Sequence, residues 1–169
     1  SRVPLKPAAT LRCEMAAAVA QWVRDDMAPL AARLDTTLRA MDNFDSYDCR
    51  GRNRVVGALI SEHGKANAID VRGFSLGDGR SLSFTDRTLA IGTRDGVKAS
   101  VCARFTTVLG PGSDWYHEDH VHLDLAQRRS GFRLCQWEIW EPLPAVVPLP
   151  PERPEDAPPR EEGQREKEK

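Results

Sequence analysis

The stretch AIDVRGF, residues 68–74, alternates small or apolar residues with larger ones. In an extended chain, Ile69, Val71 and Gly73 would point to one face, and the even-numbered residues would point to the other. This period of two predicts a β-strand. The strand carries a carboxylate, Asp70, on the face opposite Ile69 and Val71.

Working outward from this strand, the pattern predicts the other elements. Asp78-Gly79 signals a tight turn, and residues 81–84 are expected to return as the second strand of a hairpin. Alternating residues predict further strands over 37–47, 121–125 and 132–140. Alanine-rich periodicity predicts a helix over 11–34 with a kink or a new start near Pro29, and a second helix over 96–109 capped by Asp95. The expected fold class is a small α+β domain with helices packed on an antiparallel sheet.

The chain of 169 residues divides into three expected parts. Residues 1–10 form an extended lead-in, 11–141 form the folded domain, and 142–169 form a tail. Eight of the 12 prolines lie between Pro142 and Pro159, and the last ten residues are almost all charged. This composition predicts a disordered tail, either a spacer or a solvated terminus.

The charge and hydropathy of the chain exclude some classes of partner. The formal net charge of -1 predicts no binding to nucleic acid. No apolar run approaches the roughly 20 residues of a membrane-spanning helix. No signal peptide is visible, but the chain begins at Ser1, so we expect a targeting segment to have been removed.

The four cysteines, Cys13, Cys49, Cys102 and Cys135, are widely spread and form no CxxC motif. Their even number favours two disulfides and an exported protein, whereas four buried thiols in the cytosol are the alternative. Three connectivities are open. Pairing cysteines adjacent in order gives Cys13–Cys49 and Cys102–Cys135 as the expectation.

All four histidines lie in two short segments, SEHGKANAID (61–70) and HEDHVH (117–122). A turn after His63 can bring its imidazole near Asp70, and residues 120 and 122 would share one face of a strand. Two imidazoles and one carboxylate suit zinc, and three protein ligands leave a position open for water. The alternatives are two half-exposed histidines and an ordinary hydrogen bond between His63 and Asp70.

These segments resemble known motifs. SEHGKANAID is similar to the S-x-H-x-x-G-x-A-x-D motif of zinc D-alanyl-D-alanine peptidases, and HEDHVH is similar to the H-x-D-H-x-H motif of the same superfamily (LAS). Together with SYDCR (46–50), residues 102–125 and Cys135, they resemble the bacterial extensin-like C-terminal domain family over about residues 11–135. The glycine that usually precedes A-x-D is absent near Asn67, and Gly64 stands next to His63 instead, so the turn between the ligands is expected to differ.

The resemblance implies an LAS zinc-peptidase-like fold and a role for each site residue. It implies that zinc (Zn²⁺) is held by three ligands: His63, Asp70 and His122. It further implies that Asp119 is the catalytic acid/base, that His117 stabilises the oxyanion, and that His120 lies just behind the ligands.

Residues near the two motifs are candidates for substrate binding. Arg50 is our first choice among Arg50, Arg52 and Arg54 for holding a substrate carboxylate, although a solvated basic loop is the alternative. Ser61 either binds substrate or caps a turn. Trp115 and Tyr116 either line the cleft or belong to the core.

These observations lead to a hypothesis about function. We expect a zinc metallopeptidase of the bacterial envelope, periplasmic or secreted, that hydrolyses amide bonds in peptidoglycan peptides as an endopeptidase or a carboxypeptidase. The alternatives are a non-catalytic cell-wall-binding module that retains the zinc site, and a zinc hydrolase acting on another amide or ester.

Overall fold

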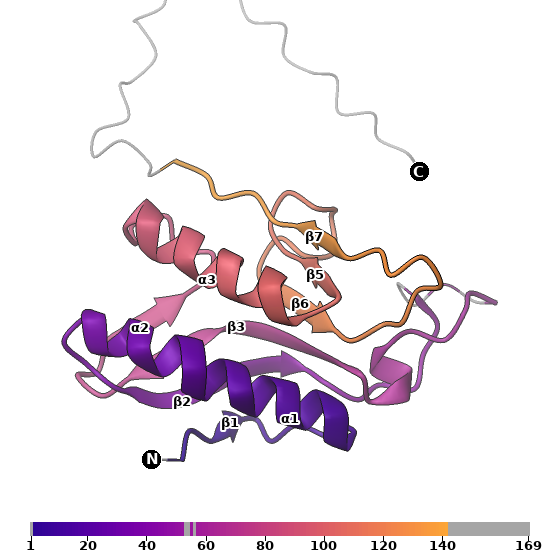
Figure 1. Ribbon diagram of the computed structural model, residues 1–169, viewed down its shortest axis with the longest axis horizontal. Helices are drawn as coiled ribbons and strands as arrows, with labels where there is room; N and C mark the ends of the chain where they lie inside the picture. The colour runs from indigo at the N-terminus through magenta and orange to yellow at the C-terminus, as the bar shows by residue number, and fades with distance from the viewer. Residues whose placement is uncertain (1, 53–54, 56, 142–169) are drawn as a thin grey trace, which may run out of the picture.

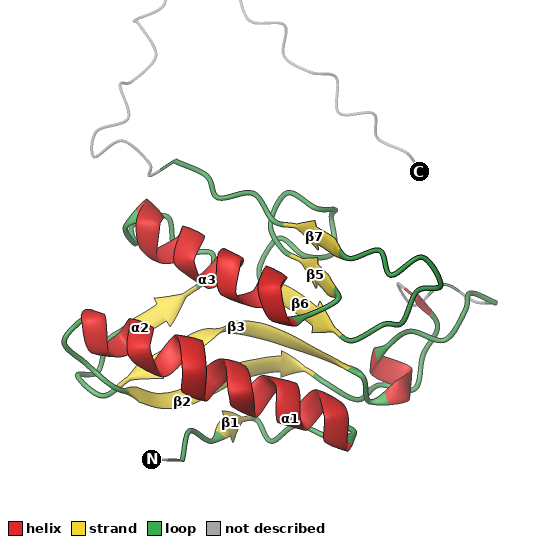
Figure 2. Cartoon of the chain, viewed as in Figure 1, coloured by secondary structure: helices red, strands yellow, loops and turns green. Residues whose placement is uncertain are grey.

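The computed structural model describes residues 2–52, 55 and 57–141. Its helices lie over one face of a seven-stranded sheet (Figures 1 and 2). The strands are β1 (Leu5–Lys6), β2 (Leu38–Asp45), β3 (Ala68–Leu76), β4 (Ser81–Ser83), β5 (Thr107–Leu109), β6 (Val121–Asp124) and β7 (Leu134–Gln136). The helices are α1 (Cys13–Trp22), α2 (Ala28–Arg33) and α3 (Ile91–Arg104), with a π-helical segment η1 (Val23–Met27) and a 3-10 turn η3 (His63–Lys65).

The sheet is mixed, which corrects the expectation of a small antiparallel sheet. Its order is β1-β2-β3-β6-β5-β7, and β4 pairs with β3. The central pairs are antiparallel, but β1 pairs parallel to β2, and β7 pairs parallel to β5. Each edge strand runs parallel to its neighbour in the sheet. A long stretch of chain separates the two strands of each pair, and such a connection can return the chain in the same direction.

The helices cover one face of the sheet and close the core over it. Trp22, at the end of α1, is fully buried, and its ring centroid lies 5.6 Å from that of Phe74 and 6.0 Å from that of Phe105. Its Nε1 donates a hydrogen bond to Ser100 Oγ of α3 at 2.9 Å. One tryptophan therefore joins α1, α3 and β3.

The sequence predicts a kink or a new helix start near Pro29, and a new start is what the structure has. The chain passes from α1 through η1 into α2, and Pro29 occupies the first turn of α2. Proline is tolerated in the first turn of a helix, where its fixed φ suits the helical backbone.

The second helix differs from its predicted range. It begins at Ile91, so Asp95 lies inside it, and it ends at Arg104. Val97 and Val101 are buried as expected, but residues 107–109 form β5. The backbone becomes extended at Phe105, and Thr107 and Val108 pair with β6. Both residues are β-branched, and such residues suit a strand better than a helix.

A bulge in β3 changes which side chains face the core. Asp42 of β2 pairs with Gly73, and Asn43 pairs with Val71, so Arg72 is an extra residue in β3. Gly73 has a φ of 156°, and a Cβ there would lie 2.1 Å from Leu82 O. Because of this bulge, Phe74 joins Val71 on the core side, contrary to simple alternation.

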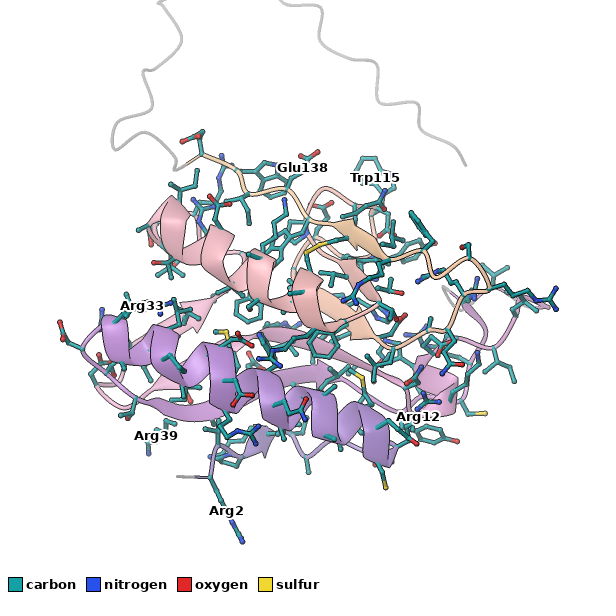
Figure 3. All side chains as sticks on the ribbon, viewed as in Figure 1. Arg2, Arg12, Arg33, Arg39, Trp115 and Glu138 are labelled. Atoms are coloured by element: carbon teal, nitrogen blue, oxygen red, sulfur yellow. A yellow bond between two sulfur atoms is a disulfide. The ribbon has the colours of Figure 1, made fainter. Side chains whose placement is uncertain are left out.

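One of the two expected disulfides is present. Cys102 of α3 and Cys135 of β7 are bonded, with their Cα atoms 5.7 Å apart (Figure 3). Cys13 and Cys49 are free and exposed, so the expected Cys13–Cys49 bond is not formed. Cys13 opens α1 and Cys49 lies in the loop after β2, and their order in the chain did not specify that their sulfurs would meet.

Within the lead-in predicted for residues 1–10, the described residues 2–10 contain β1 and no helix. The tail predicted for 142–169 lies outside the described residues. Within the described ranges, no helix is long and apolar enough to span a membrane.

Candidate metal centre

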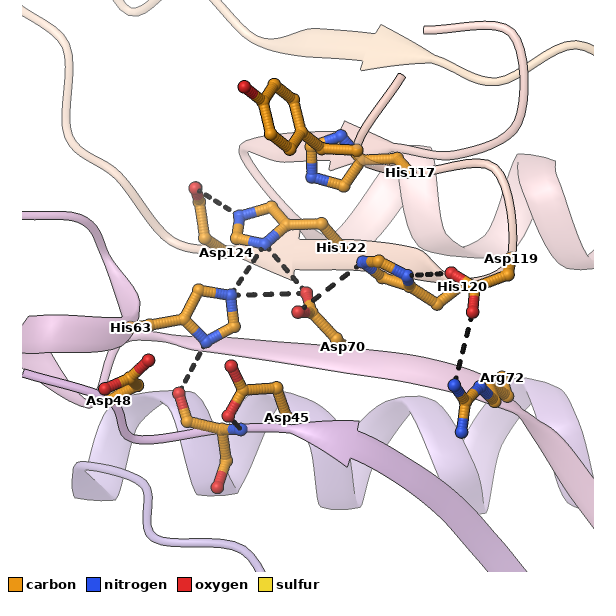
Figure 4. A network of polar contacts seen from close by, with 12 residues as sticks. Asp45, Asp48, His63, Asp70, Arg72, His117, Asp119, His120, His122 and Asp124 are labelled. Atoms are coloured by element: carbon orange, nitrogen blue, oxygen red, sulfur yellow. Dashed lines mark hydrogen bonds and ion pairs between the residues drawn. The ribbon is translucent and has the colours of Figure 1, made fainter. Parts of the chain in front are cut away.

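The pairing of β3 with β6 brings two of the expected ligands together. Asp70 and His122 are register partners in this antiparallel pair, and both side chains leave the face opposite the helices. His63 reaches the same point from η3, just before β3 begins. Figure 4 shows the three side chains converging. All three are buried, with exposed fractions of 8% or less.

The distances between their ligand atoms fit a metal ion. His63 Nε2 lies 3.1 Å from His122 Nδ1 and 3.2 Å from Asp70 Oδ1. His122 Nδ1 lies 2.9 Å from Asp70 Oδ1. A tetrahedral zinc ion with bonds of about 2.0–2.1 Å would separate these atoms by about 3.3 Å. The triangle is therefore close to one face of such a site.

In each candidate histidine ligand, one ring nitrogen is hydrogen-bonded to the protein. The other nitrogen, His63 Nε2 or His122 Nδ1, has a free lone pair when the ring is neutral. His63 Nδ1 lies 2.5 Å from Ser46 O, a carbonyl that only accepts, so in the neutral ring the proton is on Nδ1 and Nε2 has a free lone pair. His122 Nε2 lies 3.0 Å from Asp124 Oδ2, which fixes the proton on Nε2 when the ring is neutral. Two nitrogen lone pairs and a carboxylate oxygen then face one point, an arrangement that a cation satisfies.

The electrostatics of the site keep Asp70 ionised. Burial opposes its charge, but hydrogen bonds with His122 and His63 outweigh it and hold the pKa of Asp70 far below its ordinary value. Burial also opposes a charge on His122. Its hydrogen bonds with Asp124 and Asp70 prevail and raise the pKa of His122 to about 9, so a proton competes with a metal at Nδ1.

The three ligands open into a cleft of about 830 Å³. Its walls include Phe44 of β2, Tyr116, and two further histidines, His117 and His120. Trp115 is 94% exposed and does not line the cleft (Figure 3). The three candidate ligands therefore lie in the wall of this cleft.

His120 lies beside the metal centre, and Asp119 contacts His120 on the side away from the centre. His120 Nε2 is 3.5 Å from Asp70 Oδ2, and His120 Nδ1 is 2.7 Å from Asp119 Oδ1. Asp119 lies behind His120, does not line the metal cleft, and pairs with Arg72 at 3.2 Å. Hydrogen bonds with His120 and Arg72 lower the pKa of Asp119.

His117 lines the cleft from the other side. Its Nδ1 lies 2.6 Å from Asp114 Oδ1, and its ring centroid lies 5.6 Å from that of His122. Burial lowers the pKa of His117 although Asp114 opposes this shift. The ring is therefore biased toward its neutral form, with the proton on Nδ1.

The two expected substrate-binding residues both line the cleft but are engaged within the protein. Arg50 Nε donates to Asp48 Oδ2 at 2.9 Å, and Arg50 Nη2 lies 3.6 Å from Asp45 Oδ2. Ser61 Oγ accepts a hydrogen bond from Gly64 N at 3.2 Å, so it caps the turn that carries His63. Arg54 lies outside the described residues.

The turn between His63 and Asp70 closes without glycine at the motif position. Ala66 takes the glycine's place and adopts a left-handed backbone with a φ of 51°. The turn is held by Glu62, whose carboxylate accepts from Asn67 Nδ2 at 2.5 Å and whose carbonyl accepts from Asn67 N at 2.9 Å. The departure from the motif therefore puts a residue other than glycine in a left-handed conformation. His63 and Asp70 still lie in contact.

Sequence reasoning did not assign roles to Asp124 and Arg72. The signal for Asp124 was present, because it lies two residues after His122 and shares its face of the strand. No local pattern pointed to Arg72, whose direction depends on the bulge in β3.

Comparisons with known proteins place the chain in a family. The family model described as the extensin-like protein C-terminus matches residues 1–136. No curated protein and no solved structure matches the chain. This match covers the whole sheet and both histidine motifs, and the chain therefore belongs to the extensin-like protein C-terminal family.

Proposed function

We propose that this chain is a zinc-dependent peptidase of the bacterial envelope that hydrolyses amide bonds in peptidoglycan peptides. The observation that carries the proposal is the convergence of His63, Asp70 and His122, within 4.8 Å of one another, on an open cleft. Two imidazoles and a carboxylate are a donor set that suits zinc, and a three-ligand site is typical of catalysis. The likeness of both motifs to those of zinc D-alanyl-D-alanine peptidases supports a peptide substrate and an LAS-like fold.

Zinc held by these ligands would supply a water molecule with a pKa near 7 and polarise the substrate carbonyl. The residues around it supply the proton transfers. His120 presents Nε2 at the Asp70 side of the cleft, and Asp119 accepts the hydrogen bond from Nδ1. This pair can accept a proton at His120 Nε2 and return it to the leaving amine, while Asp119 stabilises the charged ring.

His117 is the candidate for stabilising the oxyanion. Only an imidazolium could donate from Nε2, because Nδ1 is committed to Asp114. The bias of His117 toward its neutral form means that this role requires the substrate's developing negative charge to favour protonation.

The disulfide between Cys102 and Cys135 supports an exported location, periplasmic or secreted, because such bonds persist in oxidising compartments.

A non-catalytic cell-wall-binding module that retains zinc is the second candidate. It is favoured by one observation: Asp119, the acid/base implied by the motif, is held outside the metal cleft by Arg72. The two functions differ in whether intact peptidoglycan is cut or only bound.

The test is to incubate the zinc-loaded protein with purified peptidoglycan and to analyse the fragments by mass spectrometry. Release of cross-linked dimers as monomers indicates an endopeptidase, and release of single amino acids indicates a carboxypeptidase. Asp119→Ala should keep zinc and lose about 10²–10⁴-fold in rate, and His117→Ala should keep zinc and lose about 10²–10³-fold. Binding without any cleavage would contradict the peptidase proposal and favour the binding module.

A further inference from the structure

Four side chains form a closed ring of contacts beside the metal centre. Arg72 Nη2 donates to Asp119 Oδ2 at 3.2 Å, and Asp119 Oδ1 accepts from His120 Nδ1 at 2.7 Å. The His120 ring lies 4.7 Å from the ring of Phe44, centroid to centroid. The Arg72 guanidinium lies 3.9 Å from the Phe44 ring centroid and completes the ring of contacts. Figure 4 shows the Asp119 carboxylate contacting His120 through one oxygen and Arg72 through the other.

The bulge in β3 explains why Arg72 points to this place. Arg72 is the extra residue between Val71, which pairs with Asn43, and Gly73, which pairs with Asp42. It also lies where β3 changes partners, because Val71 is the last residue paired with β6 and Gly73 is the first paired with β4. Bulges re-aim side chains and are frequent next to active sites.

Asp119 depends on these contacts for its orientation. Its side chain is 64% exposed, and it lies in the loop before β6, so the strand backbone does not fix it. Arg72 holds one carboxylate oxygen and His120 holds the other. Loss of Arg72 would free one oxygen of Asp119 and remove the cation stacked on Phe44, which itself packs against His120.

We infer that Arg72 is a positioning residue of this site, which acts through Asp119 and Phe44 to hold His120 with Nε2 directed at the metal centre. Its kinetic consequence rests on the proposed peptidase function. The geometric consequence for His120 is a single ring orientation in which Nδ1–H donates to Asp119, and this consequence does not depend on turnover.

The kinetic test compares Arg72→Ala with Arg72→Lys on a peptidoglycan peptide. Arg72→Ala should lower kcat by about 10–100-fold, as for other outer partners of metal sites, with little change in KM or in zinc content. Arg72→Lys should recover part of the loss, because lysine can still pair with Asp119. Arg80→Ala is the matched control: Arg80 pairs with Asp78 at the turn after β3, and its loss should leave kcat unchanged.

The geometric test uses the ring ¹⁵N resonances of His120 in the full-length, zinc-loaded protein. The native protein should show one tautomer protonated on Nδ1, and Arg72→Ala should show a mixture of tautomers. A native tautomer protonated on Nε2, or an unchanged His120 signal and kcat in Arg72→Ala, would overturn the inference. If the native protein cuts nothing, the proposed function fails, and the His120 resonances still decide whether Arg72 positions the ring.

Discussion

The two faces of β3 and β6 are made of alternate residues of the same strands, yet they are stabilised in different ways. The residues facing the helices are apolar and fully buried: Ile69, Val71, Val121 and Leu123. The residues on the opposite face are polar, and Asp70, His122 and Asp124 are almost as buried, with exposed fractions of 4–8%. Burial alone therefore does not distinguish the core from the site.

The two faces differ in the interactions that compensate for removing their side chains from water. The inner face gains free energy from the apolar area that it removes from water. The outer face must compensate desolvated polar groups by pairing them with each other. His63 Nε2, His122 Nδ1 and Asp70 Oδ1 face one another at 2.9–3.2 Å, and this grouping is fully compensated only when a cation or a proton joins them. We therefore expect the apolar face, which packs against the helices, to fold without a ligand. The polar face opposite the helices should need a bound ligand to compensate its desolvated groups.

The largest effect is expected from His122→Ala. This substitution removes one of three ligands, so the protein should lose zinc and all measurable peptidoglycan cleavage, while the inner face keeps the fold. Elemental analysis and far-ultraviolet circular dichroism would measure both properties. Retention of stoichiometric zinc by the variant would show that the assigned ligand set is wrong.

On the inner face, Leu123→Ala should cost about 2–5 kcal/mol of the free energy of unfolding, because it opens a cavity in a fully buried site. Zinc stoichiometry at saturating metal should not change. Urea denaturation would measure the loss, with Leu125→Ala, a half-buried neighbour, as the control with a smaller effect. A loss of zinc in Leu123→Ala would contradict the separation of the two faces.

The affinity for zinc should rise with pH. In the metal-free protein the pKa of His122 is raised from 6.5 to about 9, so the bound proton stabilises the metal-free fold below pH 6.5, and this contribution disappears as the pH rises through 9. Zinc must displace that proton, so its affinity should increase by about tenfold per pH unit between pH 7 and 8.5. Competition with a chromogenic chelator, corrected for the chelator's own protonation, would measure this slope. A flat profile would mean that His122 binds metal without losing a proton.

Asp124→Asn should weaken zinc binding by about 10–100-fold, because the carboxylate behind His122 Nε2 raises the basicity of the ligand and fixes its tautomer. The same chelator competition would measure it. Asp86→Asn is a suitable control, since the Asp86 carboxylate accepts hydrogen bonds from Thr88 N and Oγ1 in a turn away from the site. Unchanged affinity in Asp124→Asn would show that Asp124 is not needed to orient His122.

The smallest effect is expected from Ala66→Gly, which restores the glycine of the motif. It should stabilise the protein by about 0.5–1 kcal/mol, since a left-handed φ of 51° strains alanine, and glycine's greater freedom in the unfolded chain offsets part of the gain. Ala103→Gly, at an exposed position of α3, should destabilise the protein by about the same amount. Destabilisation by Ala66→Gly would mean that the turn tolerates alanine without strain.

Local sequence was sufficient for elements whose side chains follow a simple period. The strand follows from alternation over residues 68–71, before the bulge at Arg72. The hairpin turn at 78–79 follows from its turn residues, and the new helix start follows from Pro29. The three candidate ligands were also readable, because every histidine falls in one of two motifs. The helix predicted to run to Leu109 failed because pairing of residues 107–109 with β6 overrode a local helical pattern.

Only the tertiary structure decided the features that depend on pairing between distant segments. The register that places Asp70 beside His122, the parallel edge strands, and the Cys102–Cys135 bond all join residues separated by dozens of positions. The bulge that turns Arg72 toward Asp119 arises from the pairing of β2 with β3, in which β3 has one extra residue. The sequence of either strand alone does not show it. The sequence by itself therefore determined which groups are available for chemistry, and the sheet register determined which of them meet.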